Sequence, residues 1–323
     1  NTVFRWPALV SIGIILCSAW LGSPAGGDKV PSLDEVLQIE KELIESRRSI
    51  PSGRVVIRIR TPVYEQFPSL IDIEKRYITY FKEDKIRFDT EFSTGKETDR
   101  EQKVFTEDTY IHAEPDDRKA NLFGPKTKPK DSSMITDPRR LGLICWFYDS
   151  LNQFGYEHVF LSPNRDEFKI AAGNESGAPV WKVSFRRSVG DEQAFGEYWI
   201  AEHMGRLPLY MANVYGEGEN QIVHSITMKL KRDRAGDTWF PSEVIFRETQ
   251  GGRTTIEEIT SVEDAEFGQD LADRTFTLAG LGLPEGCAVY VDGKMAVWDG
   301  ERLVREAHAP ESESEDVAGP SGP

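Results

Sequence analysis

The sequence predicts an α+β fold in which one N-terminal helix precedes a large antiparallel β-sheet or barrel. Residues 32–48 carry apolar side chains at helical spacing, and after Gly53 the apolar period changes from about 3.6 residues to 2. Short alternating runs then continue to about residue 304, most of them separated by glycine-containing turns. Regular spacing of this kind predicts one large sheet rather than two unrelated domains.

The helix is predicted from its two ends and its apolar stripe. The run Ser32–Glu35 matches a capping box, in which the serine caps the helix and the glutamate reaches back. Arg47 and Arg48 complement the helix dipole near the end, and a Pro-Ser-Gly run follows at 51–53. The stripe consists of Leu33, Val36, Leu37, Ile39, Leu43 and Ile44.

The strands are predicted from alternation. The first, from Arg54, alternates Val55, Ile57 and Ile59 with arginines, which is typical of an antiparallel strand with one apolar and one wet face. The dipeptides Asp292-Gly293 and Asp299-Gly300 predict tight turns near the end of the sheet. The other candidates are KRYITYF, KIRFDTEF, KVFTEDTYIHA, FKIAAG, VWKVSFRRS, FGEYWIAE, LPLYMANVY, IVHSITMKLKRD, WFPSEVIFRET, RTTIEEITSVEDAEF and AVYVDGKMAVWDGERLV.

Three segments interrupt this pattern. Residues 113–140 are rich in Pro, Lys and Asp and predict a long polar loop, and residues 140–154 carry an apolar stripe compatible with a short helix. The tail 307–323 is acidic, rich in Pro, Gly and Ser, and predicted to be disordered. We therefore expect one domain over residues 26–306.

The first 25 residues predict a secretory signal peptide. Arg5 is their one charge, and a run of about 15 apolar residues is short for a membrane span, which needs roughly 20. Ser23 and Ala25 would direct cleavage before Gly26, and the mature protein would then be exported to the periplasm or cell envelope. Two alternatives remain: an uncleaved membrane anchor, and lipidation at Cys17, although the bulky Leu16 suits that processing poorly.

Composition limits the partners. The formal net charge of −15 and the pI near 4.9 argue against nucleic acid, because no basic stripe is available to displace counterions from phosphates. Removal of the signal peptide would leave Cys145 and Cys287, for which free thiols are favoured over the disulfide that export would permit.

Motifs for chemistry are missing from the sequence. It contains no nucleophile elbow, phosphate-binding loop, dinucleotide fingerprint, H-E-x-x-H pair or paired C-x-x-C, and its five histidines are scattered singly. We therefore predict a protein that is not an enzyme and needs no cofactor, with an envelope hydrolase as a remote alternative.

The hairpin at residues 197–215 is one of the most aromatic stretches of the chain. Tyr198, Ile200, Leu209 and Met211 are expected on its strand faces. Two interpretations stay open: these side chains form core beneath a helix, or they line an apolar cavity in which methionine and aromatic groups adapt to a lipid-like ligand. The predicted strands carry more apolar surface than one helix can bury, and this imbalance favours a cavity.

The order of these segments resembles the outer-membrane lipoprotein-sorting (LolA/LolB-like) proteins of bacteria. The resemblance lies in SLDEVLQIEKELIESRRS, SGRVVIRIR, YFKEDKIRFD and FTEDTYIHAEPD, and later in GDTWFPSEVIFRETQGG and EITSVEDAEFGQDLADRTFTL. TDPRRLGL and FTLAGLGLPEGCAVYVDGK resemble large uncharacterised exported members. Together these segments span roughly residues 32–306.

The resemblance implies a strongly curved, unclosed β-barrel wrapped around one or a few helices, with an apolar concave cavity. Members of known role carry lipoprotein acyl chains there. Arg87 matches an arginine that lies near the cavity and regulates its lid, and Phe88 beside it would line the cavity as well. The leading hypothesis is therefore an exported, non-enzymatic protein that binds an acyl chain or another hydrophobic ligand, with an envelope protein as a further partner. The rival is a structural or protein-interaction module whose barrel is filled by its own side chains.

Overall fold

The computed structural model describes residues 30–65, 74–93, 98–126, 137–142, 165–189, 192–236 and 238–304. The predicted signal peptide (1–25), the predicted tail (307–323), Cys145 and nearly all of the predicted helix at 140–154 lie outside the described residues. Cys287 is a buried free thiol.

The predicted N-terminal helix is present as α1 (Leu33–Arg48). Its capping box forms in both directions, because Glu35 N donates to Ser32 Oγ at 3.3 Å and Ser32 N donates to Glu35 Oε2 at 2.6 Å. Arg47 and Arg48 occupy the last turn, where cations favour the helix dipole. The helix therefore begins and ends where local sequence chemistry predicts.

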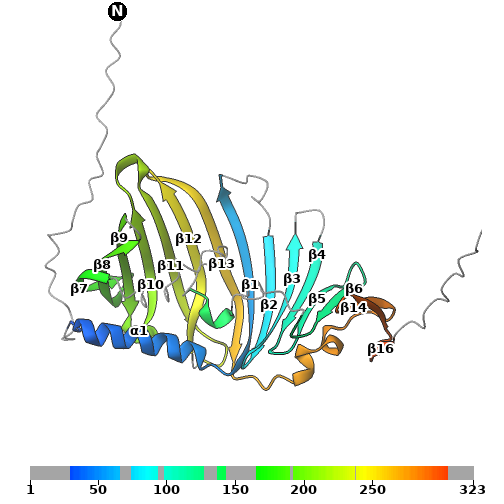
Figure 1. Ribbon diagram of the computed structural model, residues 1–323. Coiled ribbons are helices and arrows are strands. Elements are labelled where there is room, and N and C mark those ends of the chain that lie inside the picture. Colours follow the sequence, from blue (N-terminus) through cyan, green and yellow to red (C-terminus); the bar gives the residue numbers. More distant parts are fainter. Residues whose placement is uncertain are drawn as a thin grey trace, which may run out of the picture.

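The described strands form one open sheet of sixteen strands with β7 and β16 at its two ends (Figure 1). Its spatial order is β16-β15-β14-β6-β5-β4-β3-β2-β1-β13-β12-β11-β10-β9-β8-β7. The strands are β1 (Ser52–Tyr64), β2 (Glu74–Lys82), β3 (Lys85–Ser93), β4 (Thr98–Phe105), β5 (Tyr110–Glu114), β6 (Lys119–Phe123), β7 (Arg165–Glu175), β8 (Ala178–Val189), β9 (Glu192–Ala201), β10 (Leu207–Tyr215), β11 (Ile222–Arg232), β12 (Trp239–Gln250), β13 (Arg253–Phe267), β14 (Cys287–Val291), β15 (Lys294–Trp298) and β16 (Leu303–Val304).

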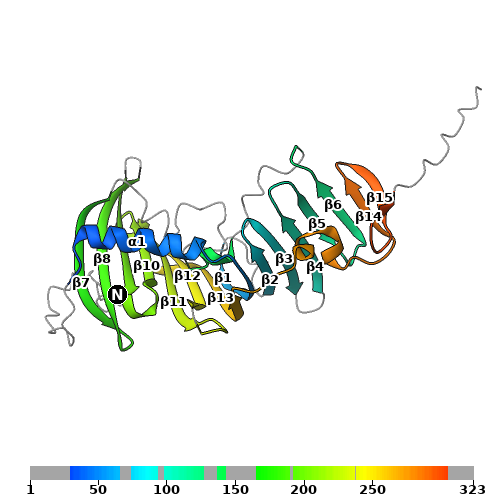
Figure 2. The same cartoon turned by 90° about the horizontal axis from the view of Figure 1, so that it is seen from below.

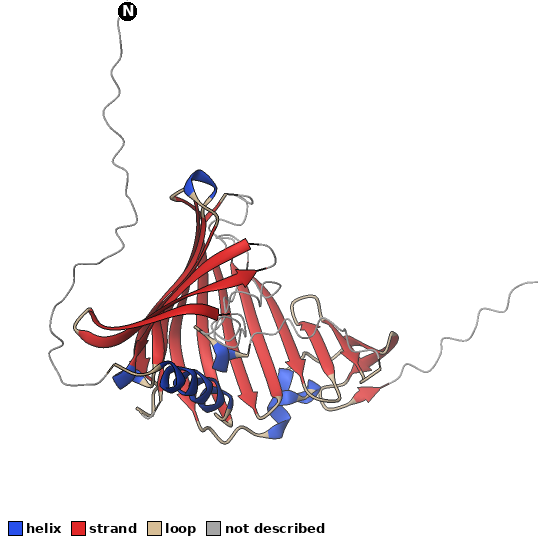
Figure 3. Cartoon of the chain, turned by 60° about the vertical axis from the view of Figure 1, so that its left-hand side comes forward, coloured by secondary structure: helices blue, strands red, loops and turns tan. Residues whose placement is uncertain are grey.

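The sheet curves strongly, with α1 near one end of its strands (Figure 3). Seen from below, α1 crosses β7 to β12, whereas the segment that follows β13 lies beside β3 to β5 (Figure 2). That segment contains the short helices η7 (Asp273–Phe276) and η8 (Leu278–Leu281). The prediction of an unclosed antiparallel sheet with one α-helix is thus confirmed in outline.

Two details of the sheet differ from the prediction. The segment expected as a polar loop at 113–140 contains β6, which pairs with β5 across a turn at 115–118. The pair β6–β14 is parallel, so the sheet is mixed. Sequence pattern does not predict β6 because Ala120 and Asn121 have low β propensity, whereas Ala120 is fully buried by tertiary packing.

Two hydrophobic cores lie on opposite faces of the sheet. The first joins Val36 and Leu43 of α1 to strand side chains such as Phe81, and the second contains Val104 of β4, with Tyr80 packed against it. Tyr80 and Phe81 are neighbours on β2, and successive side chains of a strand point to opposite faces. We call the face that packs against α1 the inner face and the other the outer face.

The second core is covered by η7 and η8. Phe276, Leu278 and Leu281 from these helices are buried against it, together with Trp298 of β15. The helix α1 is therefore not the sole cover of the sheet, since the two cores lie on different faces.

Candidate functional site

The inner face of β9 to β13 carries an apolar strip that leads away from α1. Strand register places its side chains in three rows across the sheet. The row nearest α1 is Met228, Val244 and Thr260; the next is Tyr198, Met211, Ile226, Phe246 and Glu258; the third is Asn213, His224, Glu248 and Ile256.

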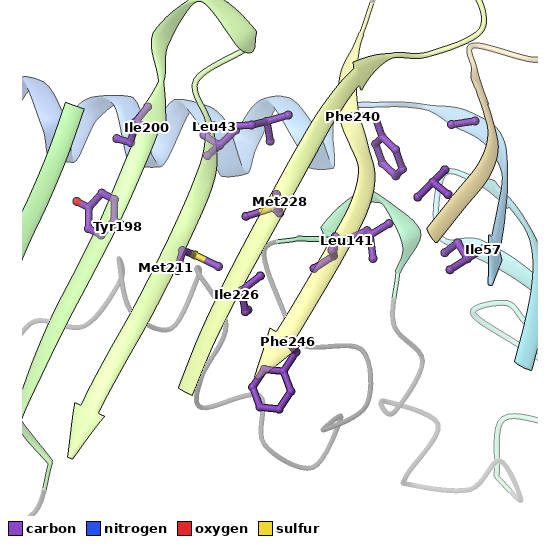
Figure 4. Packing of buried hydrophobic residues seen from close by; sticks show 14 of the residues in the cluster. Leu43, Ile57, Leu141, Tyr198, Ile200, Met211, Ile226, Met228, Phe240 and Phe246 are labelled. Carbon is purple, nitrogen blue, oxygen red and sulfur yellow. The ribbon is translucent and has the colours of Figure 1, made fainter. Parts of the chain in front are cut away.

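Three of the predicted ligand-lining residues meet in this region. Tyr198, Ile200 and Met211 are all buried, at 0%, 0% and 4% exposure, and belong to the first core. Figure 4 shows Ile200 next to α1, which carries Leu43, whereas Met211 lies farther along the strands. The Tyr198 hydroxyl donates to Glu40 of α1, which ties this strand to the helix. Tyr198 and Ile200 are thus helix-packing residues, and Met211 belongs to the strip beyond.

Leu209 is less enclosed than that group. It falls at a bulge between Pro208 and Tyr210, where β10 leaves its register with β9, and it is only half-buried. A bulge inserts an unpaired residue and re-aims the chain locally. Sequence alternation alone could not locate it.

The structure separates Arg87 and Phe88 from the strip and from each other. As neighbours on β3 they point to opposite faces. Phe88 is buried and contacts Phe105 edge-on, with ring centroids 6.3 Å apart. Arg87 is on the outer face, where it donates to both carboxylate oxygens of Asp89 at 2.8 Å.

Arg87 also holds the cover of the second core. Its Nη1 donates to the Gly280 carbonyl at 2.7 Å and to the Thr275 carbonyl at 3.3 Å, and its guanidinium lies over the Tyr80 ring at 5.4 Å. The predicted arginine is therefore a residue that attaches a covering segment, but on the face away from α1.

A cluster of polar side chains ends the apolar strip. His224 Nε2 and Glu248 Oε2 lie 2.9 Å apart, and Thr255 Oγ1 donates to Glu248 Oε1 at 2.8 Å. Asn213 is opposite His224 in the strand register and is 3% exposed. Within the described part of the chain, its side-chain oxygen is buried and accepts no hydrogen bond. A buried polar atom without a hydrogen-bond partner costs desolvation free energy, and this atom distinguishes the polar end of the strip from the rest.

The environment of His224 disfavours the charged form of its imidazole. Burial lowers its pKa below the usual 6.5, and the hydrogen bond with Glu248 opposes this shift without cancelling it. The ring also contacts Phe246, with centroids 6.1 Å apart. The cluster therefore places a buried amide oxygen beside a histidine–glutamate pair at the end of an apolar strip.

Sequence reasoning misses this cluster. Histidines scattered singly predict surface or hydrogen-bonded residues, and no pattern distinguishes His224 from the others. Asn213, His224 and Glu248 come from three consecutive strands and meet through the register of those strands. The available signal is a polar residue near the end of each of three consecutive apolar strands.

Comparison with known proteins gives weak likenesses to solved structures. No family model matches the chain, and no curated protein matches it. An uncharacterised conserved protein from Thermus thermophilus has 12% identity and a TM-score of 0.31, covering 79% of this chain and 99% of its own. MucB, solved in complex with MucA(peri), has 9% identity and a TM-score of 0.22, covering 70% of this chain and 93% of its own. Neither value carries an argument about this chain, so the lipoprotein-sorting relationship stays a resemblance. None of the described helices has the length and apolar character needed to span a membrane.

Proposed function

We propose that this protein is a non-enzymatic carrier of the periplasm or cell envelope that binds an amphiphile with a long apolar chain. The chain would lie along the inner face of β10 to β12, with the polar head at Asn213, His224 and Glu248. The lipoprotein-sorting resemblance motivates the acyl chain as the leading ligand class.

The side chains of the strip suit an apolar chain. Met211 and Met228 are unbranched and polarisable, so they can adapt to a flexible ligand. Ile226, Val244 and Phe246 continue the apolar face along the strands and are buried in the first core, which also contains Leu141. From Val244 to Glu248 the strand advances roughly 13 Å at about 3.3 Å per residue, which sets the length of apolar chain that the strip can hold.

The observation that carries the proposal is the amide of Asn213. Its oxygen is buried without a described hydrogen-bond donor, at the end of an apolar strip and beside a histidine–glutamate pair. A protonated or hydroxylated head group would supply the missing donor. A packed core gains nothing from such an atom, because an apolar residue of similar size would avoid the desolvation cost.

Displacement of a fluorescent long-chain alcohol, whose hydroxyl can donate to Asn213, tests the proposal. Met211→Gln should abolish probe binding, and Asn213→Leu should weaken it roughly tenfold, the loss of about one hydrogen bond. Val214→Gln is the matched control, because Val214 neighbours Asn213 on β10 and points to the outer face. It should bind the probe like the wild type.

A structural or protein-interaction module is the second candidate. Complete burial of Tyr198 and Ile200 against α1 favours it, because those side chains are already enclosed by the protein. In that case the wild type binds no probe, and Met211→Gln lowers the free energy of unfolding by the cost of an unsatisfied buried amide, about 1–3 kcal/mol. Absence of probe binding by the wild type would overturn the carrier proposal.

A further inference from the structure

The open edge of the sheet at β7 has the features of a pairing edge. In the part of the chain that the structure describes, β7 is the last strand and pairs with β8 alone. An edge strand presents a row of backbone N–H and C=O groups that another strand can bind. A bulge between Asp166 and Lys169 ends the regular pairing at one side, and the hairpin turn ends it at the other. Seven regular residues, Lys169 to Glu175, remain between them.

The hairpin turn determines which of these residues face outward. Ser176 and Gly177 both have positive φ, 51° and 87°, as in a two-residue type I′ turn. Glu175 and Ala178, which flank such a turn, form a hydrogen-bonded pair, and the pattern alternates along the strand. The N–H and C=O groups of Asn174, Ala172 and Ile170 therefore point to the open edge.

The side chains of this stretch are complementary to those of a second, antiparallel copy of the same stretch. When β7 is placed antiparallel to a second β7 about a two-fold axis at Ala172, Lys169 faces Glu175 and Ala171 faces Gly173. Residues whose backbone N–H and C=O groups point to the open edge then lie opposite each other: Ala172 faces Ala172, and Ile170 faces Asn174. A hydrogen-bonded ladder requires this match. A shift by two residues would place Lys169 opposite Gly173 and leave the charges without partners.

We propose that β7 pairs with β7 of a second copy of this chain, in the antiparallel register centred on Ala172. Small side chains at Ala171, Ala172 and Gly173 permit close approach, and Lys169, Ala171, Ala172 and Asn174 are exposed. Two Lys169–Glu175 pairs, one on each side of the axis, set the register. Ile170 of β7 packs against the first core, so pairing at this edge would bring the first cores of the two copies next to each other.

Cross-linking tests the register directly. Ala172→Cys places two cysteines opposite each other, at the roughly 5.5 Å Cα separation of a hydrogen-bonded pair, which a disulfide can span. Mild oxidation should convert this variant to a covalent dimer. Lys294→Cys, at an exposed position on β15, is the control and should stay monomeric in a denaturing gel. Equal cross-linking of both variants, or none of Ala172→Cys, would overturn the proposal.

Charge exchange tests the same contact in solution by sedimentation at several protein concentrations. Lys169→Glu places like charges opposite Glu175 on both sides of the axis and should raise the dimer Kd roughly tenfold. The double variant Lys169→Glu/Glu175→Lys should restore the wild-type Kd to within about threefold. Lys294→Glu changes the net charge by the same amount but lies far from the β7 edge, so it should leave the Kd unchanged. A wild type that is monomeric throughout, or a double variant without rescue, contradicts the assigned contact; circular dichroism of each variant verifies that it is folded.

Discussion

Arg47 and Arg139 each bind the main chain around the other. Arg47 Nε donates to the Arg139 carbonyl at 2.8 Å, while Arg139 Nη1 donates to the carbonyls of Arg48 at 3.3 Å and Ile50 at 3.2 Å. The Arg47 guanidinium also lies 4.5 Å from the Phe240 ring centroid. This exchange joins the end of α1 to η3 (Pro138–Arg140) and to the first core.

Replacement of Arg47 by alanine should destabilise the protein. Arg47 is 3% exposed, so Arg47→Ala leaves a cavity and buried carbonyls without a donor. We expect the free energy of unfolding to fall by about 2–4 kcal/mol, measured by urea denaturation. Lys41→Ala on the exposed face of α1 should change it by less than about 0.5 kcal/mol. Similar effects of both changes would show that the hydrogen bonds of Arg47 contribute little to stability.

Loss of Arg87 should release the cover of the second core. Arg87→Met removes the hydrogen bonds to Asp89, Thr275 and Gly280, and we expect a loss of about 2–4 kcal/mol. Limited proteolysis should then cut between residues 269 and 284 faster than in the wild type. Arg100→Met is the control, because Arg100 is 61% exposed and 3.9 Å from Glu91. If the cover stays protected in Arg87→Met, the arginine does not hold it.

Acid should remove a contribution from Glu101. Burial alone would raise the pKa of this carboxyl, but close contacts with His112 Nε2 at 2.6 Å and Lys103 Nζ at 2.9 Å lower it from 4.5 to about 2. Because the folded pKa is the lower one, the contribution is complete above about pH 4.5 and is lost as the pH falls toward 2. Glu101→Gln should cost on the order of 1–2 kcal/mol at pH 7 and flatten the acid limb of the stability profile. The exposed Glu107→Gln should leave that limb unchanged; equal profiles for the two variants would refute the assignment.

We expect residues 32–306 to unfold as one unit despite their two cores. The strands β1 to β4 connect both halves through a continuous ladder. Phe240→Ala in the first core and Phe276→Ala in the second should each shift the same transition, by about 3–5 kcal/mol. Calorimetry measures this, and two separate transitions in either variant would indicate independently folding halves.

Local chemistry makes part of the fold predictable. The capping box at Ser32 and the Asp292-Gly293 turn depend on neighbouring residues, and both form as predicted. The period of 2 after Gly53 is also a local pattern, and it predicts an antiparallel sheet. It also implies that Arg87 and Phe88 point to opposite faces, although the family resemblance places both in one cavity.

Long-range packing decides the rest. β6 escapes prediction because Ala120 is buried by η7, η8 and β14, not by its neighbours in sequence. The polar cluster at His224 depends on the relative register of β10, β11 and β12, which no single strand encodes. The candidate site is therefore half predictable: Met211 is found from its pattern, and the polar end is not.

The central β1–β13 pair has a consequence for how the chain is made. Arg54 of β1 and Asp264 of β13 are hydrogen-bonded at 2.8 Å and are 210 residues apart in the chain. At roughly 5–20 residues per second, a ribosome needs on the order of 10–40 s to supply β13 after β1. Until β13 emerges, β1 lacks its partner on that side, so the edge of β1 is exposed. We expect the nascent chain to be a substrate for holding chaperones until β13 emerges.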